Sequence, residues 1–89
     1  MNAKVYVLLD VSHGKANQVA RALRAKPGVV AIDLLEGPPD VVLTVEAPNR
    51  QKLAEFTVEA LTLVESMTEE TQLLPVCIGS EGYEVKKIL

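Results

Sequence analysis

The fold is decided by the stretch Val5-Tyr6-Val7-Leu8-Leu9-Asp10-Val11, together with the break Ser12-His13-Gly14 that follows it. Every second residue from Val5 to Val11 is aliphatic, which predicts a strand with one buried side. After the break, apolar residues recur three and four positions apart, which predicts an amphipathic helix over residues 15–25 with Ser12 as its N-cap. The apolar positions of this helix are Ala16, Val19, Ala20 and Leu23. Pro27-Gly28 is expected to end it.

A hairpin is expected after the helix. Val29–Leu35 and Val41–Ala47 are rich in β-branched and aliphatic residues, which predicts two strands. The link Glu36-Gly37-Pro38-Pro39-Asp40 consists of turn-forming residues, so we expect the two strands to be antiparallel. In the first strand of this hairpin, alternating side chains are expected to point to opposite faces of the sheet. Val30, Ile32 and Leu34 would lie on one face, and Val29, Ala31 and Leu35 on the other.

The last part of the chain predicts a second helix and a fourth strand. Asn49 is the expected N-cap of the helix, which continues to about Ser66. Its expected buried stripe is Leu53, Phe56, Thr57, Ala60, Leu61 and Val64. The fourth strand is expected over Thr71–Ile78, and Pro75 predicts that it lies at a sheet edge or carries a bulge.

This order of elements is typical of the ferredoxin-like βαββαβ fold. We therefore expect one α+β domain over residues 1–78, in which a four-stranded antiparallel sheet carries two helices on one face, and a C-terminal tail over residues 79–89. Both faces of the first two strands are largely apolar, whereas a half-solvated sheet alternates apolar with polar residues. We expect a second copy of the chain to cover the face of the sheet that carries no helices, which gives a homodimer.

The composition excludes several classes of function. The 89 residues carry a net charge of -3, so no basic field is available for direct binding of nucleic acid. Apolar runs such as Val29–Ile32 and Val41–Leu43 are too short to cross a membrane, and the N-terminus shows no secretory signal, which favours a cytoplasmic protein. The single cysteine, Cys77, forms neither an intrachain disulfide nor a zinc site alone, and we expect no metal and no cofactor.

Few residues carry recognisable chemistry. His13 has no second histidine or cysteine near it in the sequence, and Cys77 lies among apolar residues, so a solvated loop residue and a packed thiol are expected. Asp10 and Asp33 stand on strands without a partner that would make them acid or base catalysts, so ion pairs are expected there. The acidic residues around the end of the second helix lack the spacing of a calcium loop, and we expect a solvated acidic end. They are Glu65, Glu69 and Glu70.

The loop Gly37-Pro38-Pro39-Asp40 is the one segment that exceeds the needs of packing. Gly37 can adopt a positive φ, the two prolines stiffen the link, and Asp40 places a carboxylate where the next strand begins. Such a loop can hold an ammonium group and offer backbone N–H groups to a carboxylate. The same residue types also dominate plain turns, so both interpretations stay open.

Taken in order, these segments resemble the ligand-binding domain of the Lrp/AsnC family of regulators, the regulation-of-amino-acid-metabolism (RAM) domain. The resemblance covers about residues 4–78. It rests on Tyr6-Val7-Leu8-Leu9, Gly14-Lys15, Val19, Ala20, Leu23, Pro27-Gly28-Val29 and Gly37-Pro38-Pro39-Asp40 followed by Val41–Val45. It implies a dimeric α/β barrel that binds a free amino acid or related small effector between subunits and assembles from dimers into rings.

The resemblance also implies a site. The family's effector hairpin falls on Gly37, Pro38, Pro39 and Asp40, with Pro39 where the family usually has an aromatic residue. The family's Thr-x-Thr motif is represented only by Glu70-Thr71-Gln72, which adds Thr71 to the expected ligand-binding residues. The resemblance begins at the first strand, so we expect a stand-alone module without the helix-turn-helix domain. Such a module would reach DNA only by joining a DNA-binding relative of the Lrp/AsnC type.

We therefore expect a module that senses an amino acid or small metabolite, acts through its oligomer and is not an enzyme. One alternative is a small dimeric α/β-barrel enzyme of the oxygenase or isomerase kind, for which His13, Tyr6 and Tyr83 are the available residues. A second is an ACT domain, another amino-acid-binding module, whose copies pair side by side. A third is a structural oligomerisation module in which the loop is only a turn.

Overall fold

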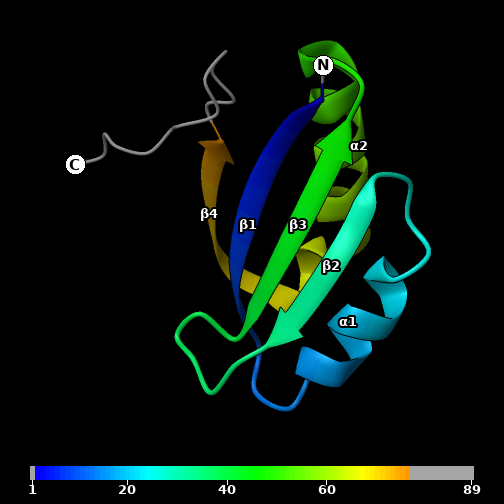
Figure 1. The fold of residues 1–89 in the computed structure, drawn as a ribbon. Helices are drawn as coiled ribbons and strands as arrows, with labels where there is room; N and C mark the ends of the chain where they lie inside the picture. Colours follow the sequence, from blue (N-terminus) through cyan, green and yellow to red (C-terminus); the bar gives the residue numbers. More distant parts are fainter. Residues whose placement is uncertain (1, 77–89) are drawn as a thin grey trace.

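Four strands form one antiparallel sheet in the order β2-β3-β1-β4, and both helices lie behind this sheet in Figure 1. The computed structural model describes residues 2–76. The elements are β1 (Ala3–Val11), α1 (Ala16–Leu23), β2 (Val29–Leu34), β3 (Val41–Ala47), α2 (Arg50–Leu63), a 3-10 turn η1 (Glu65–Met67) and β4 (Thr68–Val76). This arrangement confirms the ferredoxin-like α+β fold and the antiparallel hairpin of β2 and β3. Within residues 2–76, no helix is long and apolar enough to span a lipid bilayer.

The core lies between the sheet and the two helices. Alternate residues of β1, from Val5 to Val11, are buried, and β3 buries Val41, Leu43 and Val45 beside them. The helices contribute Val19, Ala20, Leu23, Thr57 and Ala60, and Val64 is buried directly after α2. Burial of each valine or leucine side chain stabilises the fold by about 1.5–3 kcal/mol before the entropy of ordering is counted. The helical stripes expected from the sequence are therefore the ones that face the sheet.

The helix boundaries differ slightly from the expected ones. Asn49 is confirmed as the N-cap of α2, because its side-chain oxygen accepts a hydrogen bond from the Lys52 N–H at 2.8 Å. The N-cap of α1 is Lys15, which makes no side-chain cap, so the expectation for Ser12 is wrong. Only the backbone oxygen of Ser12 takes part, as the acceptor of the Lys15 N–H. The second helix ends at Leu63, before the expected Ser66, and η1 completes the turn into β4.

A bulge in β2 changes the faces of this strand. The β2–β3 register shifts between Val29 and Ala31, so Val29, Ile32 and Leu34 pair with the buried side of β3. Asp33 therefore lies on the bare face, opposite Val42. The bare face, which is the side of the sheet away from the helices, is consequently mixed in polarity rather than largely apolar as expected. It also carries Lys4, Tyr6, Leu8, Asp10, Thr44, Glu46, Glu70, Gln72 and Leu74.

β4 is an edge strand, as Pro75 predicts, and starts at Thr68, three residues before the expected position. Residues 77 and 78 of the expected strand lie outside the described part of the chain. The helices pack mainly on other strands: α1 on β2, and α2 on β3 and β1. Seven of the nine residues of β4 are exposed as a result. The edge of the sheet that β4 forms beside β1 is therefore largely accessible.

Candidate functional site

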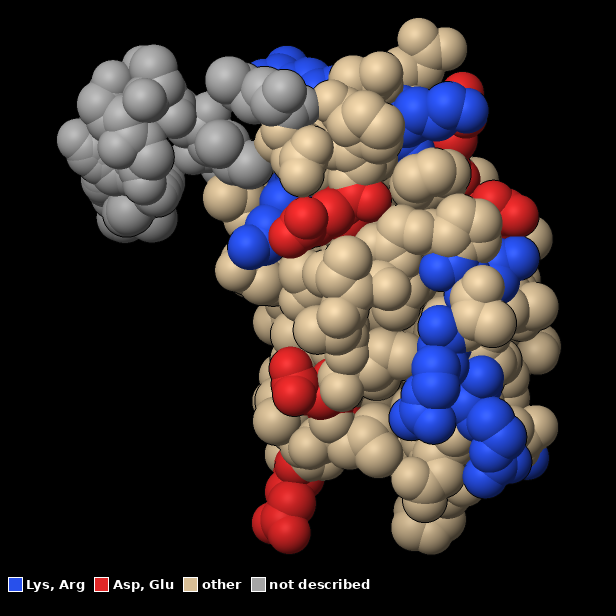
Figure 2. Space-filling model, turned by 45° about the vertical axis from the view of Figure 1, so that its right-hand side comes forward, with Lys and Arg blue, Asp and Glu red and all other residues tan. Residues whose placement is uncertain are grey.

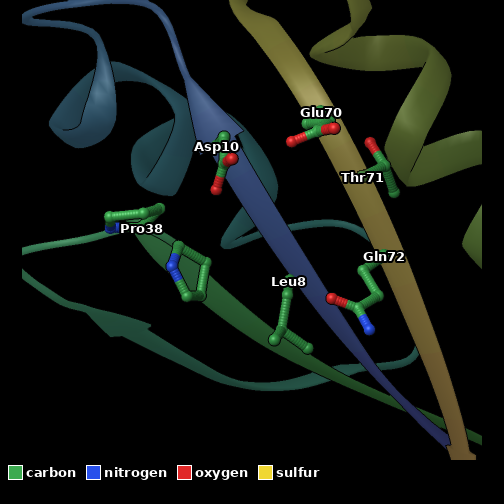
Figure 3. A pocket seen from close by; sticks show the side chains of 7 residues that line it. Leu8, Asp10, Pro38, Glu70, Thr71 and Gln72 are labelled. Atoms are coloured by element: carbon green, nitrogen blue, oxygen red, sulfur yellow. The ribbon is translucent and has the colours of Figure 1, made fainter.

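A cavity of about 380 Å³ lies where the loop between β2 and β3 meets the ends of β1 and β4 (Figure 3). This volume falls within the usual range for small-molecule sites, about 300–1,000 Å³. The cavity is lined by Leu8, Asp10, Pro38, Pro39, Glu70, Thr71 and Gln72. Three separate parts of the chain therefore form its walls.

Hydrogen bonds from Asp40 attach the loop to β1. The Asp40 carboxylate accepts a hydrogen bond from the Val11 N–H at 2.9 Å, and the Asp40 N–H donates to the Leu9 carbonyl at 2.9 Å. The Leu35 N–H closes the loop by donating to the Asp40 carbonyl at 2.8 Å. Gly37, with a φ of +26°, lies so close to the Asp40 carboxylate that an added Cβ would overlap it. Gly37 and Asp40 thus shape the loop, and Pro38 and Pro39 form the cavity wall.

Polar groups from β1 and β4 face this wall. Asp10 and Glu70 are directly opposite each other in the β1–β4 register, and Figure 3 shows both side chains on the cavity side of their strands. Among residues 2–76, no side-chain hydrogen bond or ion pair involves either carboxylate. Two like charges opposite each other on neighbouring strands destabilise a sheet, so a positively charged ligand group between them would be favoured.

Gln72 and Leu8 complete the site. Both point toward the cavity in Figure 3, where the Gln72 amide can donate and accept hydrogen bonds. Leu8 adds an apolar surface beside the prolines. The cavity thus has one apolar wall, two unpaired carboxylates and one amide.

The Lys and Arg side chains gather elsewhere, on the side of the molecule where α1 lies (Figure 2). Lys15, Arg21, Arg24 and Lys26 are the basic residues of that segment. No lysine or arginine is among the described residues that line the cavity. The described residues contain no group of three or more His, Cys, Asp or Glu side chains that could hold a metal ion.

The expected site residues are brought close together but differ in position. Pro38, Pro39 and Thr71 line the cavity, whereas Gly37 and Asp40 lie behind the wall. The Thr71 side chain points away from Glu70 and Gln72, toward the helix side of β4 (Figure 3). A ligand-binding role for these five residues stays a prediction.

Asp10, Glu70, Gln72 and Leu8 were not among the expected ligand-binding residues. The sequence predicts an ion pair for Asp10, which has no catalytic partner near it in the sequence, and a solvated acidic end for Glu70, which lacks the spacing of a calcium loop. The signal that joins them is the pairing of β1 with β4, which brings every second residue of both strands to the same face. His13 is exposed in the loop before α1, and Cys77 lies outside the described residues.

Comparison with known proteins agrees with this fold. A family model for the Lrp/AsnC ligand binding domain matches residues 4–72. A hypothetical protein from Pyrococcus horikoshii has a similar structure, with a TM-score of 0.77 and 20% identity over 96% of this chain and 100% of that chain. No curated protein sequence matches the chain.

Two similar structures are transcriptional regulators. One is a regulatory protein of the AsnC family from Pyrococcus furiosus, with a TM-score of 0.67 and 22% identity over 97% of this chain and 53% of that chain. The other is a regulator from Neisseria meningitidis in complex with L-Met, with a TM-score of 0.67 and 17% identity over 92% of this chain and 53% of that chain. This chain spans about half the length of both regulators. These likenesses support the fold, and the family model, which covers most of the chain, shows that the protein belongs to the Lrp/AsnC ligand-binding domain family.

Proposed function

We propose that this protein senses a free amino acid or a related small metabolite, which it binds in the cavity between the loop and the β1–β4 edge. The observation that carries this function is the unpaired cross-strand pair Asp10 and Glu70, which faces an apolar wall of Pro38 and Pro39. An α-amino acid matches such a site because it combines an ammonium group with a side chain of variable polarity.

Each group of an amino acid has a partner of suitable chemistry in the cavity. The ammonium group would lie between the carboxylates of Asp10 and Glu70, since charge-assisted hydrogen bonds are about twice as strong as neutral ones. The Gln72 amide can donate to the ligand carboxylate, and Leu8 and the prolines can pack against an apolar side chain. The L-Met complex of the Neisseria meningitidis regulator supports this ligand class for a protein of the same fold.

The cavity opens on the side of the bare sheet face, so a second copy could complete it. We propose a homodimer through this face, with dimers that assemble further into rings. A ligand that binds between subunits would then favour the assembled form by mass action. Mixed assembly with a DNA-binding Lrp/AsnC relative would connect the ligand to transcription. Association with such a relative in its own cell extract tests this last step, and failure to co-purify would argue against it.

Binding is favoured over catalysis. The family is one of ligand-binding domains, and an α/β-barrel enzyme would need a histidine, tyrosine or asparagine aimed into its cavity. The seven residues that line this cavity include none of the three. A cytoplasmic location is part of the same proposal, because a sensor that acts on transcription needs access to both free amino acids and the DNA-binding partner.

A thermal-shift panel of the twenty amino acids and common metabolites tests this function. A ligand at 100 times its Kd adds about 2.7 kcal/mol of apparent stability, which raises the Tm of a domain this small by several degrees. Glu70→Gln should abolish or strongly reduce the shift. Glu69→Gln is the matched control, because it removes the same charge from the neighbouring residue, which does not line the cavity. A shift that both variants keep would place the ligand elsewhere, and no shift with any compound would contradict a sensing role.

A further inference from the structure

A second hollow lies on the helix side of the sheet, away from the loop. It is a groove of about 560 Å³ between α2 and β4, over the first residues of β1. Leu53, Val58 and Leu61 form the α2 side, and Leu73 and Pro75, whose register partners Val7 and Val5 are buried, form the β4 side. The groove exists because α2 packs on β3 and β1 and leaves β4 uncovered.

The surface of this groove is apolar and accessible. Val58 is 63% exposed and Leu73 is 46% exposed, although both are aliphatic. The groove therefore offers an apolar surface that an apolar ligand can reach from solvent. The volume is also suitable for a small molecule.

Three polar residues border the groove, and Arg50 is the one whose side chain makes no hydrogen bond, ion pair or ring contact within residues 2–76. The Lys4 ammonium lies 5.4 Å from the centre of the Tyr6 ring, on the bare face and therefore on the other side of the sheet. The Thr57 hydroxyl is buried and donates to the Leu53 carbonyl at 2.7 Å. Arg50 remains, and none of the ion pairs within residues 2–76 uses its guanidinium. The groove thus combines a long apolar surface with one cation at its border.

We propose that this groove binds a small carboxylate with an apolar tail, such as a medium-chain fatty acid or another acid of similar size. Its carboxylate pairs with the Arg50 guanidinium, which can form two parallel hydrogen bonds with it. Its tail covers Val58 and Leu73. The loop cavity and the hollow between the end of α2 and the start of β4 are bordered by Asp10, Glu65, Glu69 and Glu70, which disfavour an acid that carries no ammonium group.

Octanoate, titrated into the full-length protein labelled with ¹⁵N, tests this assignment. We expect saturable shifts of the backbone amides of Ala54, Val58 and Leu73. Octylamine, which has the same tail and the opposite charge, should bind at least tenfold more weakly. Octanol, which is neutral, should also bind more weakly than octanoate.

Two pairs of variants make the test specific. Arg50→Gln should weaken octanoate binding by about tenfold, since it removes a charge-assisted hydrogen bond. Lys52→Gln removes the same charge two residues away, from an exposed side chain that does not line the groove, and should leave binding unchanged. Val58→Asp should abolish binding without unfolding the protein, because Val58 is largely exposed. Glu70→Gln should leave octanoate binding intact, so this site and the loop cavity succeed or fail separately.

Three results would overturn the assignment. The first is the absence of saturable binding, and the second is equal binding of octanoate, octanol and octylamine. The third is a set of groove amide shifts that depend on protein concentration and not on octanoate, which would assign the groove to a second copy of the chain.

Discussion

Asp40 is the residue on which the shape of the loop depends most. Its carboxylate is the acceptor for the Val11 N–H, and its backbone N–H and carbonyl bond to Leu9 and Leu35. This carboxylate is therefore engaged with the protein before any ligand arrives. Its role in the geometry is to place Pro38 and Pro39 against the cavity.

Asp40→Ala should lower the free energy of unfolding by about 1–3 kcal/mol, because the partly buried Val11 N–H loses a charged acceptor. Urea unfolding measures this change. Asp40→Asn keeps an acceptor oxygen of the same shape and should lose less than half as much. Equal losses for the two variants would show that the carboxylate does not hold the loop.

Gly28 is the second position where a single residue decides local structure. Its φ of +83° is in the left-handed region, and an added Cβ would lie 2.5 Å from Phe56 Cδ2 and 2.9 Å from the Glu46 carbonyl oxygen. Gly14 has a similar φ of +77° with nothing within 4 Å of an added Cβ. A substitution at Gly14 therefore tests backbone strain alone, whereas the same substitution at Gly28 tests backbone strain together with steric overlap.

Gly14→Ala should cost about 1–2 kcal/mol, the usual penalty for an L-residue in this conformation. Gly28→Ala should cost clearly more, since α2 must also move away from the end of β3. Thermal unfolding of the two variants measures both changes. Similar losses of stability in the two variants would mean that Phe56 can move away from Gly28 without a measurable loss of free energy.

At the scale of elements, the pairing of β1 with β4 is what creates the site. It places Asp10 opposite Glu70 and Leu8 opposite Gln72 on the same face. Like charges directly opposite each other destabilise a sheet, so the proposed site would lower the stability of the ligand-free protein.

Glu70→Gln should therefore stabilise the ligand-free protein by about 0.2–1 kcal/mol while it weakens ligand binding. Chemical denaturation with and without ligand measures both effects on one sample. Asp10→Asn should act in the same direction. A Glu70→Gln protein that is less stable than the parent would show that this carboxylate has a stabilising partner.

The elements also show what the sequence can predict. The alternation from Val5 to Val11 and the helical spacing of Val19 and Leu23 follow directly from burial on one side, so the fold was predictable. The bulge in β2 was not, because Val30 is as apolar as its neighbours and nothing local marks the extra residue. The candidate site was likewise only partly predictable. Pro38 and Pro39 are recognisable as turn residues, whereas the position of Glu70 at the cavity depends on its pairing with Asp10, which is distant in the sequence.

At the scale of the whole molecule, the bare face is the surface available for assembly. Leu74 on β4 is 43% exposed on this face, beside Tyr6, which is 37% exposed. Leu63 is equally exposed, at 45%, but lies at the end of α2. The two leucines thus differ in position and not in accessibility.

If the proposed homodimer forms through the bare face, Leu74→Asp should weaken it by tenfold or more, because a buried unpaired charge opposes association. Leu63→Asp should leave the dimer unchanged. Sedimentation equilibrium over a range of protein concentrations measures both. A stable monomer of the parent protein at micromolar concentration would contradict the dimer itself.

The most direct test of the central claim is to map the binding of the best ligand from the thermal-shift panel by the backbone amide spectrum of the full-length protein. A sensor with its site at the loop predicts saturable shifts at Leu8 and Asp10, at Asp40, and from Glu70 to Gln72, all of which disappear in Glu70→Gln and persist in Glu69→Gln. Shifts confined to the groove between α2 and β4, or shifts at the loop that Glu70→Gln leaves unchanged, would contradict it.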